Sequence, residues 1–346
     1  MDSKRITSCA ALAKLAGVAK STVSHALRDD ARVSLKTRQR IQALAKEHGF
    51  RANPLVSAQM SAVKNGRKTI SWEATIGFAA HKSLDEAVDE AKTALKFYYD
   101  GAAKRASELG FKLKFVTLRP EAEGNLKLEE SLSRHAVKGV IFAPSGIAYP
   151  LSNFEFNWSD YAVVSLANIF KNPRINSICN DEFETINRAL TRFEEAGFKR
   201  IGIAMRESQD MRVKHVWLAG FEAYQARVPR SRRIRKLMTQ DWSKENFIDW
   251  FEAERPDMIL CIDDDPMRWL GEEGVMVPRD VKLATLYWLP SRPQLAGYYQ
   301  NHEVMGAAAV DLVSAQLYHN ERGLPLEPKK VLIQSIWRDG ESFAAD

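Results

Sequence analysis

Apolar positions in the first 50 residues form three short helical stripes. The first, SCAALAKLAG, has Leu12 and Leu15 facing inward. The second covers residues 20–27, and the third follows Ser34, its expected N-cap. A turn of two or three residues that contains glycine separates the first two stripes, which is typical of a helix-turn-helix unit. The expected core residues of these three helices are Val18, Val23, Leu27, Val33, Ile41 and Leu44.

From residue 73 onward, short β-branched runs alternate with amphipathic helical stretches. The candidate strands are ATIGFAA, KLKFVTL, GVIFAPS, YAVVSLA, NSICND, KRIGIAM, DMILCID and VKLATLY. This alternation predicts parallel α/β sheets that are buried on both faces. Two such units in tandem predict two lobes, with a ligand bound beyond the carboxyl ends of the strands. The expected fold class is therefore an all-α helix-turn-helix head joined to an α/β two-lobed body with parallel sheets.

The charges of the chain divide it in the same way. Residues 1–68 contain 14 basic and 4 acidic side chains, so the totals of 50 and 44 leave 36 basic and 40 acidic residues for the rest. A basic head on a mildly acidic body indicates a polyanion-binding module attached to a second unit. A solvated basic terminus with no partner is the alternative interpretation.

Three features of the sequence bear on the compartment. The three cysteines lie far apart without a CxxC pair, which favours a reducing environment over a disulfide framework. The chain contains no run of 18 apolar residues, so we expect no transmembrane helix. The first residues lack the apolar core of a signal peptide. Together with the basic head, which indicates a polyanion-binding module, these features lead us to expect a cytoplasmic protein associated with the nucleoid.

The second helix supplies the chemistry for reading DNA. In a helix-turn-helix unit its first residues enter the major groove, where Lys, Ser, Thr and His side chains can bond base edges. Hydroxyl groups at helix starts also suit phosphates, although a Ser or Thr there can simply be a cap, and His25 can be a solvated surface residue. The expected DNA contacts of the head are Ser8, Lys20, Ser21, Thr22, Ser24, His25, Ser34 and Thr37.

The segment ALAKLAGVAKSTVSHALRDDARVSLKTRQRIQALAKEHGFRANPL resembles the head of lactose-repressor (LacI/GalR) family regulators. The motifs AGV-x-x-x-TVS, RVS-x-x-TR and HGFRANP match the family in order and spacing. Later segments, such as WLAGFEAY and YYQNHEVMGAAAVDLV, resemble its sugar-binding body, which is built like periplasmic binding proteins. The resemblance implies a repressor of transcription that binds pseudo-palindromic operator DNA as a homodimer. No heptad tail follows KKVLIQSIWRDG, so we expect a dimer rather than a coiled-coil tetramer.

The resemblance also implies a hinge helix between head and body. In the family this helix folds on the operator and wedges an apolar side chain into the minor groove. Gln59 occupies the position of the usual leucine, so either Leu55 or Met60 is the wedge or the DNA bends less. An ordinary linker is the alternative. Asn53, Leu55, Gln59 and Met60 are the expected hinge contacts with DNA.

The implied domains are a head over 1–50, a hinge and linker over 51–72, and an effector-binding and dimerisation body over 73–346. The chain is expected to cross between the lobes near residues 172, 294 and 327. The N-lobe then takes 73–172 and 295–326, and the C-lobe takes 173–294 and 327–346.

An effector is expected between the lobes, and the resemblance implies that it is a sugar or a sugar derivative. The expected effector-binding residues are His81, Phe97, Ser145, Arg212, Trp217, Asp264, Trp288, Gln300 and His302. Asp264 matches the effector-binding aspartate of the family. The family tends to place a ligand-binding arginine close before the GF of WLAGFEAY, where this chain has Val216 and Trp217, and Arg212 is the nearest arginine. Trp217 could stack on a sugar ring or belong to the core.

Other functions find less support in the sequence. The acids of IDDDP are consecutive and point in alternate directions, which does not favour a metal site. No HExxH motif or paired histidine spacing indicates a zinc site. No Walker or GxGxxG loop indicates a phosphate-binding site. We therefore expect no metal, no cofactor and no catalytic residues. A sugar-binding transport receptor would need an export signal, and a carbohydrate enzyme would need a catalytic constellation that the sequence does not identify.

Many members of the family carry arginine where this chain has His25. Arginine grips guanine bidentately at any pH, and histidine does not. We therefore expect the base preference at this contact to differ from the common one.

Overall fold

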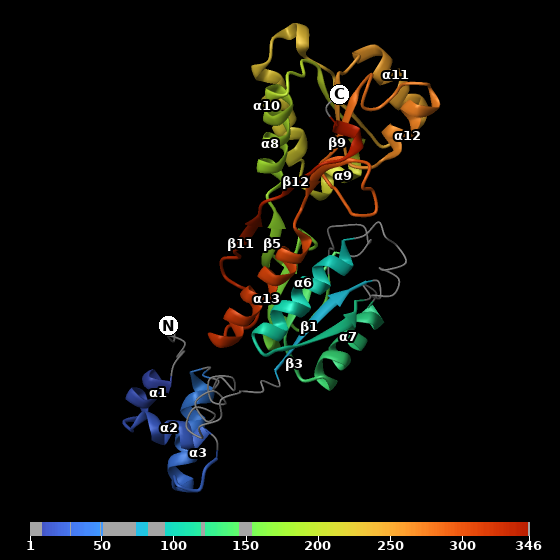
Figure 1. Ribbon diagram of the computed structural model, residues 1–346. Coiled ribbons are helices and arrows are strands. Elements are labelled where there is room, and N and C mark those ends of the chain that lie inside the picture. The colour runs from blue at the N-terminus through green and yellow to red at the C-terminus, as the bar shows by residue number, and fades with distance from the viewer. Residues whose placement is uncertain are drawn as a thin grey trace.

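The computed structural model describes residues 9–27, 29–48, 50, 74–81, 94–118, 122–144 and 154–344, without the side chains of 122–127. Three helices form the head, and two six-stranded sheets flanked by helices form the body (Figure 1). This confirms the expected fold class. Within the described part of the chain, no helix is long and apolar enough to span a membrane.

The head contains α1 (Cys9–Ala16), α2 (Lys20–Leu27) and α3 (Leu35–Glu47), as the sequence predicts. Of the six expected core residues, Val23, Val33 and Ile41 are buried, and the other three are partly buried against the same cluster. Leu15 does not face inward as expected, since 49% of its surface is exposed. The buried face of α1 instead consists of Leu12, Ala13 and Ala16.

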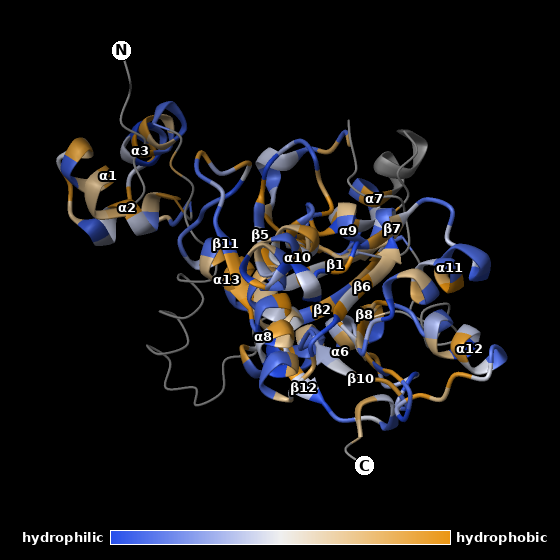
Figure 2. Cartoon of the chain, turned by 90° about the horizontal axis from the view of Figure 1, so that it is seen from above, coloured by the Kyte–Doolittle hydropathy of each residue, from blue (hydrophilic) through white to orange (hydrophobic). Residues whose placement is uncertain are grey.

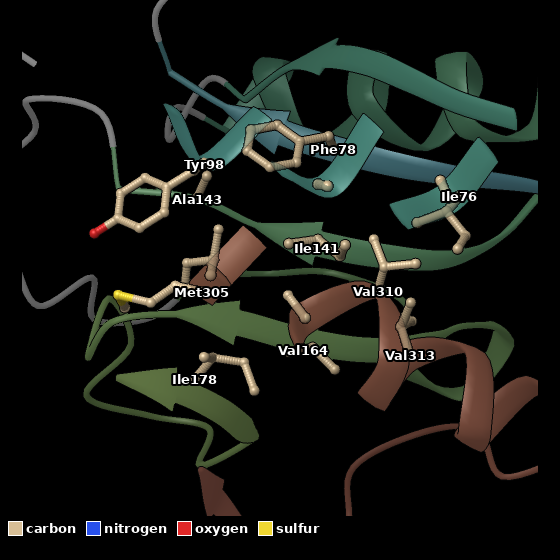
Figure 3. Close-up of a cluster of buried hydrophobic side chains, with 14 of the residues drawn as sticks. Ile76, Phe78, Tyr98, Ile141, Ala143, Val164, Ile178, Met305, Val310 and Val313 are labelled. Atoms are coloured by element: carbon tan, nitrogen blue, oxygen red, sulfur yellow. The ribbon is translucent and has the colours of Figure 1, made fainter. Parts of the chain in front are cut away.

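The first lobe is built on a parallel sheet in the order β11-β5-β4-β3-β1-β2. Its strands are β1 (Thr75–Ala80), β2 (Lys112–Thr117), β3 (Val137–Phe142), β4 (Ala162–Leu166), β5 (Asn176–Asn180) and β11 (Lys330–Ile333). Helices α6 (Leu95–Glu108) and α13 (His302–Tyr318) cover one face, and α7 (Ala122–Arg134) packs on the other. Figure 3 shows the core beneath α13, where Val310 and Val313 meet Ile141 and Val164.

The second lobe has the order β12-β10-β9-β8-β6-β7, and only the β10–β12 pair is antiparallel. Its strands are β6 (Ile201–Arg206), β7 (Leu237–Thr239), β8 (Met258–Cys261), β9 (Lys282–Thr285), β10 (Ala296–Tyr299) and β12 (Ile336–Arg338). Its helices are α8 (Glu182–Glu195), α9 (Glu207–Arg212), α10 (Val216–Arg227), α11 (Lys244–Glu254) and α12 (Asp265–Glu272). Helices α8 and α10 cover one face, and α11 and α12 the other. Figure 2 shows apolar colouring along β8 and polar colouring on the outer part of α11.

The sheets correct the expected crossings between the lobes. Strand β5 belongs to the first sheet, β10 to the second and β11 to the first. The chain therefore crosses after residues 180, 299 and 333, later than the expected positions 172, 294 and 327. The expected strand list omitted β7, β10, β11 and β12. The reason is that β7, β11 and β12 are short and poorly buried, and β10 has the sequence AGYY, without a β-branched residue.

Two glycines bring α6 and α13 into unusually close contact. A Cβ atom on Gly101 would lie 1.9 Å from the carbonyl oxygen of Glu303, and one on Gly306 would lie 2.0 Å from that of Tyr98. No larger residue fits between the two backbones without displacing one helix. This packing places the first turns of both helices, with Tyr98 and His302, against each other at the ends of the strands (Figure 1).

Candidate functional site

The exposed end of α2 is the first candidate surface. Gly17 adopts a φ of +63° and ends α1, and the amide of Val18 donates to the carbonyl of Ala13 over 3.1 Å. The next helix, α2, starts at Lys20. Lys20 and Ser21 are exposed, whereas Thr22 is half-buried. The turn therefore presents the first residues of α2 as a short polar edge, with Val23 and Ala26 buried behind it.

His25 is held in one orientation by its own head. Its Nδ1 lies 3.0 Å from Oδ2 of Asp30, and Arg32 holds the same carboxylate with its Nη2 at 2.5 Å. The hydrogen bonds from Arg32 keep the pKa of Asp30 far below its ordinary value, so this carboxylate is ionised and must accept. Nδ1 of His25 is therefore the donor, and in the neutral ring Nε2 is left as an acceptor.

The start of α3 carries the remaining expected DNA contacts of the head. The backbone N–H of Thr37 donates to Oγ of Ser34 over 3.3 Å, which confirms Ser34 as the N-cap. The two hydroxyls also lie 2.9 Å apart. Ser34 thus has the capping role that the sequence allowed, and Thr37 supplies the capped N–H. Ser8, Asn53, Leu55, Gln59 and Met60 lie outside the described residues.

A carboxylate where the lobes meet is the second candidate site. Glu182 is the first residue of α8, directly after the first crossing. Its carboxylate accepts from Nε1 of Trp217 at 3.0 Å and from Nε2 of Gln300 at 3.0 Å and 3.2 Å. Trp217 is 1% exposed and packs in the core of the second lobe, so it is a core residue that also anchors Glu182.

Burial dominates the electrostatics of this carboxylate. It raises the pKa of Glu182 to about 8, although the hydrogen bond from Trp217 and the charge of Arg212 oppose the shift. Burial also raises the pKa of Tyr98 and that of Tyr287, and both phenols respond to the charges of Glu182 and Arg212. Arg212 itself is exposed at the end of α9. Glu182, Tyr98 and Tyr287 therefore form one poorly solvated centre between the lobes, with the exposed Arg212 at its edge.

Aromatic rings enclose His302 beside this centre. The ring of His302 lies 4.9 Å from that of Tyr98, 5.1 Å from Tyr299 and 5.5 Å from Tyr287, and it stacks with Phe97 at 6.4 Å. His302 is completely buried, and neither ring nitrogen has a hydrogen-bond partner among the residues that the structure describes. Burial lowers the pKa of His302 to about 3, so the ring is neutral.

Trp288 extends the same aromatic group. Its ring lies 5.8 Å from that of Tyr299, and its buried Nε1 also lacks a partner within the described ranges of the chain. The structure thus brings together five expected effector residues around one centre: Phe97, Trp217, Trp288, Gln300 and His302.

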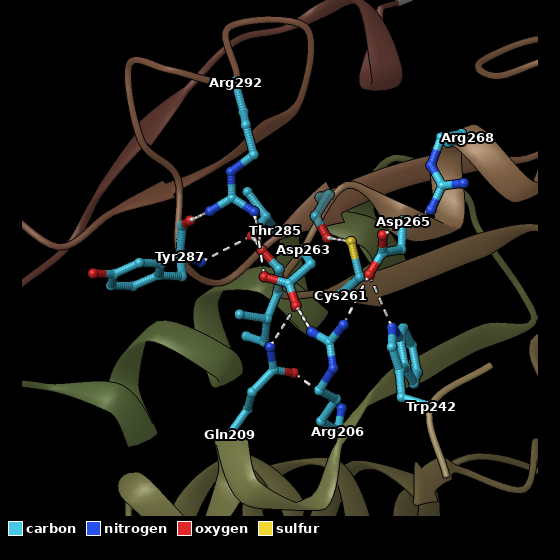
Figure 4. A network of polar contacts seen from close by, with 12 residues as sticks. Arg206, Gln209, Trp242, Cys261, Asp263, Asp265, Arg268, Thr285, Tyr287 and Arg292 are labelled. Carbon is cyan, nitrogen blue, oxygen red and sulfur yellow. Dashed lines mark hydrogen bonds and ion pairs between the residues drawn. The ribbon is translucent and has the colours of Figure 1, made fainter. Parts of the chain in front are cut away.

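The acids after β8 make a separate network (Figure 4). Arg206 pairs with Asp263 and, at 3.0 Å, with Asp265. Asp265 also accepts from Nε1 of Trp242 at 3.1 Å and pairs with Arg268 at 3.0 Å. Asp264 between them is exposed, and its side chain makes no capping hydrogen bond at the start of α12. Two of the three acids are therefore neutralised by arginines.

Of the remaining expected effector residues, Arg212 ends α9 beside the centre and Asp264 lies among the acids after β8. His81 directly follows β1, and its Nδ1 lies 3.1 Å from the carbonyl oxygen of Leu118, which follows β2. Ser145 lies outside the described residues. Across the described ranges, no group of three histidine, cysteine or acidic side chains could hold a metal ion.

Polar side chains tie the three crossing segments together. Nδ2 of Asn180 donates to the carbonyl of Ile333 over 2.8 Å, and Oγ of Ser335 donates to Oδ1 of Asn180 over 3.0 Å. The same amide lies 3.4 Å from the carbonyl of Gln300. The three interlobe crossing segments therefore form one hydrogen-bonded unit next to Glu182.

Sequence reasoning missed Glu182 and Tyr98. A usable signal was present for Glu182, because it follows a strand and begins a helix, as the expected effector residues do. Tyr98 carried no such signal, because the contact of α6 with α13 places it.

Two family models match parts of the chain. The model described as "Bacterial regulatory proteins, lacI family" matches residues 11–53. The model described as "Periplasmic binding protein-like domain" matches residues 190–343. A search among curated proteins finds no match.

Solved structures share the fold over nearly the whole chain. The lac repressor dimer bound to operator and the anti-inducer ONPF is 21% identical, with a TM-score of 0.57. The match covers 96% of this chain and 98% of the repressor chain. The complex of the transcriptional regulator CelR with cellobiose is 19% identical, with a TM-score of 0.55 and coverage of 97% and 99%. The transcription regulator CcpA of Lactococcus lactis is 15% identical, with a TM-score of 0.58 and coverage of 78% and 98%.

Proposed function

The chain belongs to the lacI family of bacterial regulatory proteins, and from this premise we propose how its parts work together. The head up to residue 50 reads operator DNA, residues 51–72 act as hinge and linker, and the body from residue 73 senses a small ligand and dimerises. Such a regulator acts on the chromosome, so we place it in the cytoplasm with the nucleoid. Repression is the output that we propose.

The observation that carries this proposal is the polar start of α2. Lys20 and Ser21 stand exposed on a compact three-helix core, and His25 beside them is oriented by Asp30. A helix that presents such side chains at its first turn fits the major groove, where they reach base edges. The basic charge of the first 68 residues supports the approach to phosphates.

The sensing site that we propose is the centre around Glu182. Its carboxylate, the amide of Gln300 and the ring of Trp288 combine polar groups with aromatic faces, which suits a sugar-like ligand. The cellobiose named in the CelR structure supports this ligand class. A ligand that prefers one arrangement of the lobes shifts the operator affinity of the head.

We do not propose catalysis at this site. Asp263 and Asp265 are held by Arg206 and Arg268, so these carboxylates are poorly placed to transfer protons to a ligand. Glu182 accepts two hydrogen bonds from neutral donors, and no acid partner for it appears in the described contacts. Absence of turnover of cellobiose by the purified protein is the expected result.

The homodimer that we propose would use the edge strands of the body. Val331 and Leu332 on β11 and Ile336 on β12 are exposed although they are large and apolar. Exposed apolar side chains on neighbouring edges are typical of a surface that another chain covers.

Selection of binding sites from random duplex DNA with the full chain tests the function. We expect a pseudo-palindromic site, bound with an affinity that falls steeply as salt rises from 50 to 200 mM, by about a thousandfold if six or more phosphates are contacted. A variant with Lys20→Ala and Ser21→Ala should lose the selected site, whereas Lys199→Ala, a change of one lysine in the second lobe, should keep it. Recovery of no enriched sequence would reject the proposal.

A further inference from the structure

The segment after β9, residues 286–295, belongs to the second lobe by its strand and reaches into the first. Leu289 is completely buried in the hydrophobic cluster that also contains Met305 of α13 and Tyr98 of α6. Tyr287 packs against the cores of both lobes and contacts the ring of His302 on α13. These side chains therefore bridge the two lobes where a ligand would bind.

The base of the segment is fixed to the second lobe (Figure 4). The buried Arg292 donates from Nη1 to the carbonyl of Ile262 at 2.9 Å and from Nη2 to that of Tyr287 at 3.2 Å. Oγ1 of Thr285 accepts the N–H of Tyr287 at 3.0 Å and donates to the carbonyl of Ile262 at 2.9 Å. Leu289 therefore moves with the second lobe, and separating the lobes must pull it out of the first.

Two sequence features fit an occupied interlobe space. Val216 and Trp217 stand where the resemblance implies a ligand-binding arginine, and Trp217 donates its N–H to Glu182. The buried nitrogens of His302 have no partner within the described contacts, although the segment packs against this ring through Tyr287. An unpaired buried polar group is costly, and a ligand that bonded these nitrogens would recover that cost.

We propose that residues 286–295 form a built-in clamp that holds the lobes closed without a ligand and determines which ligands can enter. Leu289 and Tyr287 occupy the space between the lobes, and a ligand must displace them to reach His302 and Glu182. Such a ligand favours the open arrangement, so it acts in the opposite sense to the clamp. This inference rests on the sensing role proposed above.

Single-molecule energy transfer within the full chain tests the clamp. Dyes are attached through Lys104→Cys on α6 and Glu245→Cys on α11, both exposed positions, in a Cys9→Ser background. Leu289→Ala should raise the open population about tenfold, because the methyl groups that it removes are buried only when the lobes are closed. Leu289→Met, which keeps the volume, should retain the closed distribution.

Leu270→Ala is the matched control. Leu270 is equally buried but lies in a cluster within the second lobe alone, so its loss should lower Tm and leave the distribution unchanged. The clamp is rejected if Leu289→Ala keeps the wild-type distribution or if both alanine variants open the lobes alike. DNA binding is measured on the same samples: its absence would reject the regulator, whereas the outcome for the clamp is read independently from the dyes.

Discussion

His25 shows how one side chain can set a base preference. Because Asp30 accepts the hydrogen bond of Nδ1–H, the neutral ring offers Nε2 to DNA as an acceptor. Such an acceptor pairs with the amino group of cytosine or adenine, whereas arginine donates to O6 and N7 of guanine. The interaction with Asp30 therefore gives a physical basis for the difference that the sequence predicts.

The change His25→Arg should move the preferred base at this contact to guanine. A good bidentate pair is worth about 1–3 kcal/mol of discrimination, so the shift should be evident in sites selected from random DNA. Asp30→Asn is the companion variant, since it removes the ionised acceptor that fixes Nδ1–H. Identical half-sites for wild type and His25→Arg would contradict the proposed contact.

Glu182 makes the stability of the body depend on pH. Its pKa is raised from 4.5 to about 8 in the folded protein, so the folded state holds a proton that the unfolded state releases above pH 4.5. The contribution of Glu182 to stability is therefore fully present below about pH 4.5 and is lost as pH rises towards 8. At pH 7 the loss is about 3 kcal/mol.

Glu182→Gln should remove this dependence, because the amide oxygen can still accept from Trp217 while no charge develops. We expect the free energy of unfolding in urea to fall less between pH 5 and pH 8 in the variant than in wild type. Glu195→Gln, at an exposed position on the same helix, is the control. Equal pH slopes for wild type and Glu182→Gln would argue against a buried, protonated carboxylate.

At the scale of elements, the contact of α6 with α13 positions the aromatic centre. Both helices have a glycine where the other backbone passes, and no side chain could yield to a new Cβ at Gly306, since the nearest atom is a carbonyl oxygen at 2.0 Å. The helices can only move apart, which would also separate Tyr98 from His302.

Gly306→Ala should therefore lower the free energy of unfolding by about 3 kcal/mol, through strain that outweighs the better helix propensity of alanine. Gly271→Ala in α12 is the matched control, because nothing lies within 4 Å of its new Cβ, and it should be neutral or slightly stabilising. Chemical denaturation measures both variants. A neutral result at Gly306 would mean that the two helices are not in this close contact.

Elements with a strong apolar pattern were predictable from the sequence, and strands without such a pattern were not. The expected head helices, such as the one over residues 20–27, agree with the structure because their apolar spacing and caps are local features. Strands such as β11, whose residues are mostly exposed, have no buried pattern to reveal them. Their pairing partners lie far away in the sequence, as in the register of Lys330 with Ser177.

At the scale of the whole molecule, the exposed apolar edge strands predict self-association. Leu332 on β11 is 50% exposed, and a charge at this position would have to be buried in the proposed dimer. We expect Leu332→Asp to shift the protein to monomers in analytical ultracentrifugation and to weaken operator binding, because one head then reads one half-site.

The control for this prediction is Leu326→Asp, a fully exposed leucine that lies before β11 rather than on it. It should leave the sedimentation of the protein unchanged. A Leu332→Asp variant that sediments as a dimer would exclude this edge as the interface.

The three-helix head, the parallel α/β body and the resemblance to the lacI family follow from the sequence alone, because periodicity, caps and ordered motifs are local properties of the chain. Three features follow from the folded structure only: the sheet that each crossing strand joins, the contact of Glu182 with Trp217 and Gln300, and the burial of Leu289 of one lobe in the other. These features depend on contacts between residues far apart in the chain. Hydrophobicity indicates that a residue such as Leu289 will be buried. The residues that it contacts depend on how the two lobes pack.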